Sequence, residues 1–118
     1  MSLHWVRAFC LSLPYVAEDV KWEKDLAFCI GAKMFAVMSL EPGAAVLGFK
    51  CSPTAFAELV ERPGVIPAPY LARAHWVALE HAEALPRREL EPLLGAAYQH
   101  VRAKLPKRVQ AEFLQTKP

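Results

Sequence analysis

A period-two alternation of side chains runs through residues 19–51, and only short turns break it. Three stretches read as strands, 26–30, 34–40 and 45–51, with Gly31-Ala32 and Glu41-Pro42-Gly43 between them. Strands joined by such short turns must pair antiparallel. The sequence therefore predicts an antiparallel meander, with one more strand over residues 19–24.

The same alternation predicts which side chains share a face of the sheet. Leu26, Phe28 and Ile30 should lie on one face, with Ala27 and Cys29 on the other. In the next strand, the even-numbered residues from 34 to 40 should lie on one face and the odd-numbered residues from 35 to 39 on the other. One face of such a sheet is normally packed by helices.

Proline and glycine mark the expected boundaries of two helices in the first half of the chain. Ser2 is expected to cap the first helix, and Pro14 to stop it. Ser52-Pro53 has the cap and the first-turn residue of a second helix, which should end at Pro63-Gly64.

The second half of the chain alternates between loop, strand and helix patterns. An ordered loop is expected over residues 65–69 and a fifth strand over residues 75–80. A long helix should follow, with its apolar positions at Leu90, Leu93, Leu94, Ala97, Val101 and Leu105. Because Pro92 lacks an N–H group, this helix should be kinked there or begin near Glu91. A last short helix is expected over residues 108–114.

One domain accounts for the whole chain. Its 118 residues can bury one core, and no linker divides them. We expect the α+β class, an antiparallel sheet with helices packed on one side, over residues 1–118, and a flexible tail at residues 115–118. The apolar runs are too short to span a membrane and no secretory cleavage pattern is present, so the cytoplasm is the expected location.

The sequence contains no motif that commits to a reaction. The three cysteines lie far apart without a C-x-x-C pattern, which favours buried thiols. G-x-S-x-G and the phosphate-binding glycine loops are absent. His75, His81 and Glu83 are too few to complete a metal site. We therefore expect no enzymatic activity, no cofactor and no metal.

Basic side chains beside aromatic ones give the best hint of a binding surface. The net charge is only +2, but basic residues outnumber acidic ones from residue 98 onward. Lys33 and Lys50 flank a predicted hairpin, and Arg73 comes just before His75 and Trp76. Cations beside aromatic rings can hold phosphates while the rings stack on bases. The same arrangement also arises from strand-edge solubility and from a tryptophan packed under lysine stems.

Short motifs follow one another in a characteristic order: Leu13-Pro14, Lys33-Met34-Phe35, Phe49-Lys50-Cys51 with Pro53, Pro63-Gly64-Val65, Tyr70, His75-Trp76, Tyr98 and Lys104-Leu105-Pro106-Lys107. In this order they resemble the MmcQ/YjbR-like family, from about Leu13 to Arg108. The resemblance implies a CyaY-like (frataxin-like) fold and DNA binding, since that fold is similar to a double-wing DNA-binding module. It does not imply iron binding, because the first helix lacks a dense acidic ridge.

Together these expectations describe a small non-enzymatic protein that binds DNA weakly, mainly through phosphate contacts and with little sequence preference. The expected contact residues are Lys33, Lys50, Arg73, His75, Trp76, Lys104 and Lys107. The alternative is a module that binds a protein or a small ligand and has no affinity for nucleic acid.

Overall fold

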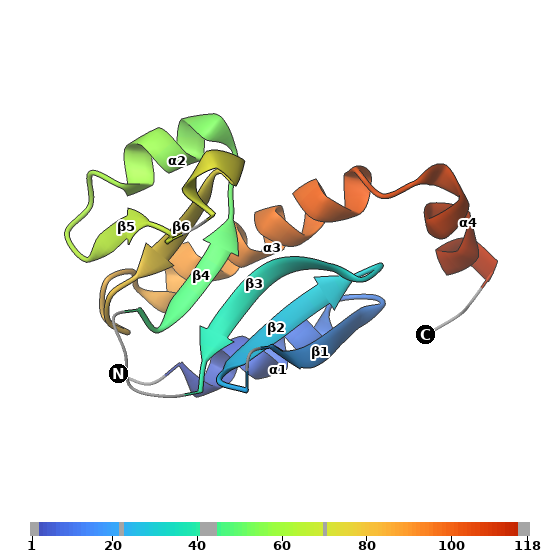
Figure 1. Ribbon diagram of the computed structural model, residues 1–118, viewed down its shortest axis with the longest axis horizontal. Helices are drawn as coiled ribbons and strands as arrows, with labels where there is room; N and C mark the ends of the chain where they lie inside the picture. The colour runs from blue at the N-terminus through green and yellow to red at the C-terminus, as the bar shows by residue number, and fades with distance from the viewer. Residues whose placement is uncertain (1–2, 22, 41–44, 70, 116–118) are drawn as a thin grey trace.

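The computed structural model describes residues 3–21, 23–40, 45–69 and 71–115 (Figure 1). The elements in these ranges are, in chain order, α1 (His4–Ser12), β1 (Val16–Lys21), β2 (Asp25–Ile30), β3 (Lys33–Ser39), β4 (Leu47–Lys50), α2 (Pro53–Leu59), β5 (Val65–Pro67), the short 3-10 helix η1 (Ala72–Ala74), β6 (Trp76–Leu79), α3 (Arg87–Ala103) and α4 (Lys107–Gln115).

The strands form one antiparallel sheet in the order β1-β2-β3-β4-β6-β5. The predicted antiparallel meander is confirmed as β1 to β4, but its first strand is Val16–Lys21 and not the expected 19–24, since residues 23–24 form a turn. The strand expected over residues 75–80 is β6, which pairs with β4. The loop expected over residues 65–69 is wrong, because Val65–Pro67 form the edge strand β5. This strand is too short for a readable alternation, and an edge position tolerates the missing N–H of its proline.

A β-bulge changes the faces predicted for β3. Phe28 pairs with Ala36 and Cys29 pairs with Met34, so Phe35 is an extra residue in its strand. Phe35 and Ala36 both belong to the main core, whereas Met34 packs in a smaller cluster on the other face. The expectation that Met34 and Ala36 share a face is therefore wrong.

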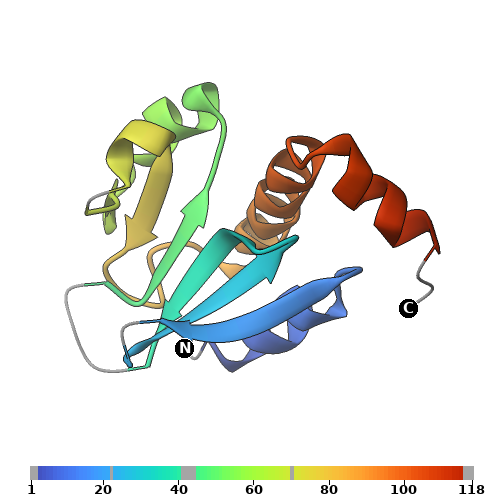
Figure 2. The same ribbon diagram turned by 45° about the vertical axis from the view of Figure 1, so that its right-hand side comes forward.

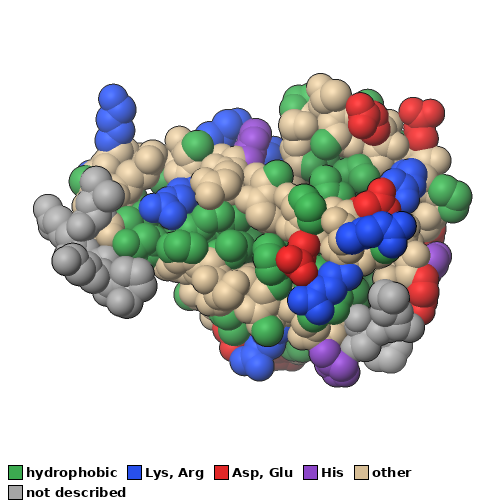
Figure 3. Space-filling view, turned by 180° about the vertical axis from the view of Figure 1, so that it is seen from behind, with side chains coloured by type: hydrophobic (Ala, Val, Ile, Leu, Met, Phe, Trp, Pro, Cys, Tyr) green, Lys and Arg blue, Asp and Glu red, His purple; other side chains and the backbone are tan. Residues whose placement is uncertain are grey.

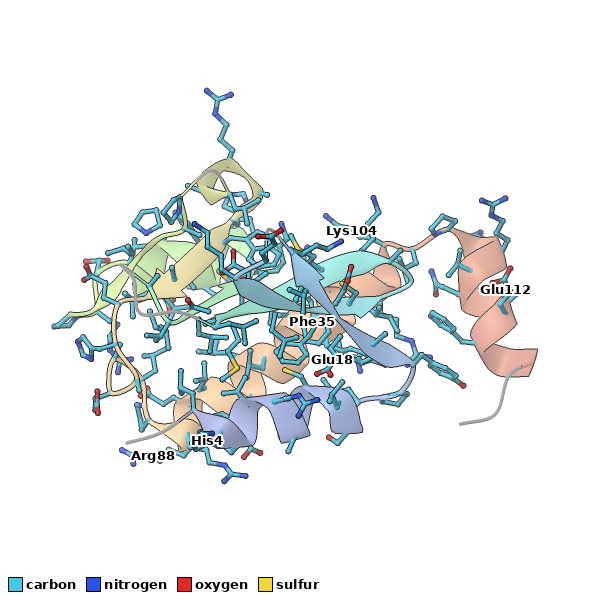
Figure 4. The ribbon with its side chains drawn as sticks, turned by 60° about the horizontal axis from the view of Figure 1, so that its bottom comes forward. His4, Glu18, Phe35, Arg88, Lys104 and Glu112 are labelled. Carbon is cyan, nitrogen blue, oxygen red and sulfur yellow. The ribbon has the colours of Figure 1, made fainter. Side chains whose placement is uncertain are left out.

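The main core lies between one face of the sheet and the helices α1, α2 and α3 (Figures 1 and 2). Its largest fully buried side chains include Phe28, Phe35, Phe49 and Tyr98. Phe35 meets Tyr98 of α3 edge to face, with ring centroids 5.6 Å apart. Figure 4 shows Phe35 in the layer between sheet and helix. The expected α+β architecture, with helices packed on one side of the sheet, is confirmed.

The helix boundaries follow the prolines with two differences. The Ser52 hydroxyl accepts a hydrogen bond of 3.1 Å from the backbone N–H of Ala55, as expected of a capping residue. The helix it caps ends at Leu59, ahead of the expected Pro63-Gly64 stop. The long helix α3 begins at Arg87, not near Glu91, and continues through Pro92.

Some expectations concern the ends and turns of the chain. Gln115 is the last residue of α4, so the tail expected over residues 115–118 does not begin there. Ser2, the turn at 41–43 and residues 116–118 lie outside the described residues. All three cysteines are buried free thiols, as predicted. Among the described helices, none is long and apolar enough to cross a membrane.

Candidate nucleic-acid interface

The register of the sheet brings several predicted contact residues to the edge formed by the C-terminal end of β4 and the N-terminal ends of β3 and β6. β4 ends where β3 and β6 begin, because each pair runs antiparallel, and Lys50 lies opposite Trp76. Lys33 begins β3 directly after the Gly31-Ala32 turn. Arg73 lies in η1, directly before β6, and so reaches the same edge.

The C-terminal end of α3 packs against this edge of the sheet. A Cβ atom on Gly31 would lie only 2.8 Å from Cδ1 of Leu105 and 3.3 Å from Cγ1 of Val109. Gly31 also has a φ of 57°, so the turn needs glycine for its backbone as well as for its close contact. The contact places Lys104, the residue before Leu105, beside the sheet edge (Figure 4).

Four basic side chains form a cluster here: Lys50, His75, His100 and Lys104. We call them the basic cluster. Burial, together with the charges of Lys104, Lys50 and His75, lowers the pKa of His100. Burial and the charge of Lys104 likewise lower the pKa of Lys50. From behind, basic and histidine side chains gather along the upper edge between α4 and α2 (Figure 3).

His75 and Lys50 are held in place by the backbone around them. His75 has a left-handed conformation, with φ 60° and ψ 50°, which is uncommon for a residue other than glycine. Its carbonyl accepts hydrogen bonds from the backbone N–H and the thiol of Cys51, at 2.9 and 3.3 Å. Its ring lies edge-on to Phe56 of α2, with centroids 5.5 Å apart. The Lys50 ammonium donates a hydrogen bond to the carbonyl of Ala74.

His100 is the member of the basic cluster that sequence reasoning missed. Its Nε2 atom is buried and has no hydrogen-bond partner among the described residues. No motif surrounds it in the sequence. The available signal was its spacing from Lys104, because residues four apart on a helix share one face.

The other predicted contact residues lie outside the basic cluster. Lys33 and Arg73 are exposed at the same edge of the sheet. Lys107 is one of the residues that line a hollow of about 270 Å³, together with Arg102, Gln110 and Ala111.

Trp76 lies on the face of the sheet away from the main core, which is also the face of its cross-strand partner Lys50. It is 5% exposed and packs with Ala68 and Ala78 in the smaller cluster. A ring this buried offers little surface for stacking on a base. The chemistry that remains at the edge is the binding of anions by lysine, arginine and histidine.

Comparison with protein families decides what kind of chain this is. The YjbR family model matches residues 11–100, which is most of the sequence. The chain belongs to the YjbR family. The resemblance drawn from the short motifs is therefore confirmed. The YjbR match ends at His100, so that Lys104 and Lys107 lie beyond it.

One solved structure supports the fold of this YjbR domain. It is a crystal structure of Deinococcus radiodurans protein DR2400, whose family-model domain is DUF419. The TM-score is 0.80 and the identity 26%, over 92% of this chain and 84% of that chain. No curated protein matches the sequence. The α+β class is confirmed, while the narrower CyaY-like assignment stays a prediction.

Proposed function

We propose that this YjbR-family protein is a non-enzymatic, cytoplasmic protein that binds DNA through its phosphate backbone. The contact surface is the basic cluster together with Lys33 and Arg73, at the same edge of the sheet. The observation that carries the proposal is the convergence of Lys50, His75, His100 and Lys104 from separate parts of the chain. The resemblance drawn from the sequence implies the same function.

Like charges held close together disfavour one another's charged forms, and a bound anion relieves this cost. The lowered pKa of Lys50 and His100 is partly an effect of such neighbours, after burial. Phosphate is therefore the ligand that suits this chemistry.

The state of the cysteines supports a role without catalysis. Burial raises the pKa of the Cys10 thiol to about 12, and burial also raises the pKa of Cys29 and Cys51. Only the thiolate is a strong nucleophile, so at neutral pH these thiols are poor catalysts.

The surface favours weak binding with little sequence preference. Phosphate contacts position a protein on DNA, whereas base contacts carry the specificity. Trp76 is buried, and the basic cluster offers few groups for reading base edges. With a net charge of +2, we expect dissociation constants of about 10⁻⁴–10⁻⁶ M, as for non-specific binding.

A salt series tests the proposal. Fluorescence anisotropy of labelled duplex and single-stranded oligonucleotides would be measured as protein is added at several salt concentrations. Neutralising a phosphate releases counterions, so about four to five contacts predict a slope of log K against log salt near −4. Absence of binding at high micromolar protein and low salt would overturn the proposal. The alternative expected from the sequence, a ligand-binding module, has support of its own in an apolar groove on the opposite face of the sheet.

A further inference from the structure

The face of the sheet opposite α1, α2 and α3 contains a groove with a volume of about 650 Å³. Its walls are mostly apolar and come from β3, β4, β6 and the connection between β5 and β6. Small-molecule sites in proteins are concave, largely apolar and about 300–1,000 Å³ in volume. The groove therefore has the size and character of a ligand site, and it lies on the face away from α3 and its basic residues.

The floor of the groove is hollow because of one glycine. Gly48 of β4 pairs with Val37 on one side and with Ala78 on the other, so no long side chain stands in this row across three strands. A Cβ atom on Gly48 would lie 3.5 Å from the carbonyl oxygen of Val77 and 3.9 Å from Cε3 of Trp76. These are ordinary contact distances, so position 48 has room for a Cβ atom, which would project into the groove.

Polar side chains gather at one end of the groove. Lys24 and Asp25 lie at the start of β2, and Asp25 pairs across the strands with Ser39. The lysine and aspartate charges cancel, and the hydroxyl of Ser39 adds no charge. A ligand with a net charge would lose its hydration in the apolar groove without a net counter-charge to compensate.

We propose that this groove binds a small, uncharged, mostly apolar molecule with one hydrogen-bonding group at one end. The apolar body lies over Gly48 and Ala78, beside the Trp76 ring. The hydrogen-bonding group lies at the Lys24–Asp25 end, where a donor and an acceptor are both present. None of the four residues of the basic cluster lines the groove, so ligand binding here can be tested independently of DNA binding.

Two fluorescent probes that differ in charge test this proposal. N-phenyl-1-naphthylamine is uncharged and has one N–H group, whereas 1-anilinonaphthalene-8-sulfonate has a similar ring system with an added anionic sulfonate. We expect saturable fluorescence enhancement with the uncharged probe, at lower concentration than with the sulfonate. No enhancement, or tighter binding of the sulfonate, would overturn the proposal.

A groove-filling variant locates the site. Gly48→Val adds a β-branched residue, which suits a strand, and places its methyl groups over the floor. We expect binding of the uncharged probe to weaken by about tenfold or more. Ala17→Val adds the same kind of bulk on the exposed face of the edge strand β1, outside the groove, and should bind like the wild type.

Folding of each variant is checked by near-ultraviolet circular dichroism and by its urea midpoint. If Gly48→Val does not fold, Gly48→Ala serves instead, since its single added carbon meets only ordinary contacts. Unchanged probe binding in a folded groove variant, or equal loss in Ala17→Val, would show that the probe binds elsewhere and would overturn the assignment.

Discussion

The guanidinium of Arg102 donates a hydrogen bond of 2.7 Å to the hydroxyl of Tyr98, one turn earlier on α3. The Tyr98 hydroxyl in turn donates to the carbonyl of Pro14, at 2.7 Å, and so ties α3 to the segment after α1. The same guanidinium lies 5.4 Å from the ring centroid of Tyr15 and 5.5 Å from that of Phe113. Arg102 therefore stabilises the fold by these contacts, although its sequence neighbourhood is basic.

Replacing Tyr98 by phenylalanine removes the hydroxyl that joins these two groups. The Pro14 carbonyl loses its donor and Arg102 loses its acceptor, while the buried ring keeps its packing. We expect a loss of about 1–3 kcal/mol in the free energy of unfolding, measured by urea denaturation. Tyr15→Phe is a matched control, because it removes one hydrogen bond, to Phe113 in the last helix. An equal or larger loss in the control would contradict the bridging role of Tyr98.

Replacing Trp76 by alanine tests how tightly the smaller cluster is packed. The side chain is 5% exposed, so the change removes a large ring from a packed environment. We expect a loss on the order of 3–5 kcal/mol in the free energy of unfolding. Trp5→Ala is the comparison, since Trp5 is only partly buried. If both variants lost the same stability, Trp76 would not be the packed residue that the structure describes.

The sequence predicted most of the sheet because alternation and short turns are local signals. It missed β5, since three residues show no period, and it missed the bulge at Phe35. A bulge adds one residue to a strand, and the apolar character of Met34, Phe35 and Ala36 hides the resulting change of face. The pairing partner decides the register there, and a single strand does not contain that information.

The candidate site was predictable only in part, for a related reason. Lys50 was expected from its place beside a predicted hairpin and Lys104 from a family motif, and the structure brings them together. His100 joins them through the packing of α3 against the sheet edge, which no local pattern describes. The sequence left Trp76 open to stacking on bases or to packing, and the structure shows it packed: its ring is 5% exposed and lies against Ala68 and Ala78.

The lowered pKa of His100 makes stability depend on pH in a stated direction. In the unfolded chain this group has a pKa of about 6.5, and in the folded chain burial and nearby cations lower it. Just below about pH 6.5 the unfolded chain binds more protons, so stability falls as the pH is lowered through this window.

Urea midpoints measured across that pH window check this prediction. His100→Gln should flatten the fall in stability, because glutamine does not titrate. His81→Gln changes a histidine just beyond the other end of β6. This variant should keep the decrease in stability that protonation of His100 causes. A His100→Gln variant with the wild-type pH dependence would contradict the prediction.

The two ends of α3 provide the sharpest test of the proposed DNA surface. Lys104 and Arg88 are both exposed cations, but Lys104 lies at the basic cluster and Arg88 lies near the start of the helix (Figure 4). Lys104→Gln should make the slope of log K against log salt shallower by about 0.9, because one phosphate contact is lost. Arg88→Gln removes the same charge from the molecule and should leave the slope unchanged. Circular dichroism would show whether α3 is intact in each of the two variants. Equal effects of the two changes would mean that net charge alone drives binding, and the basic cluster would then not be the contact surface.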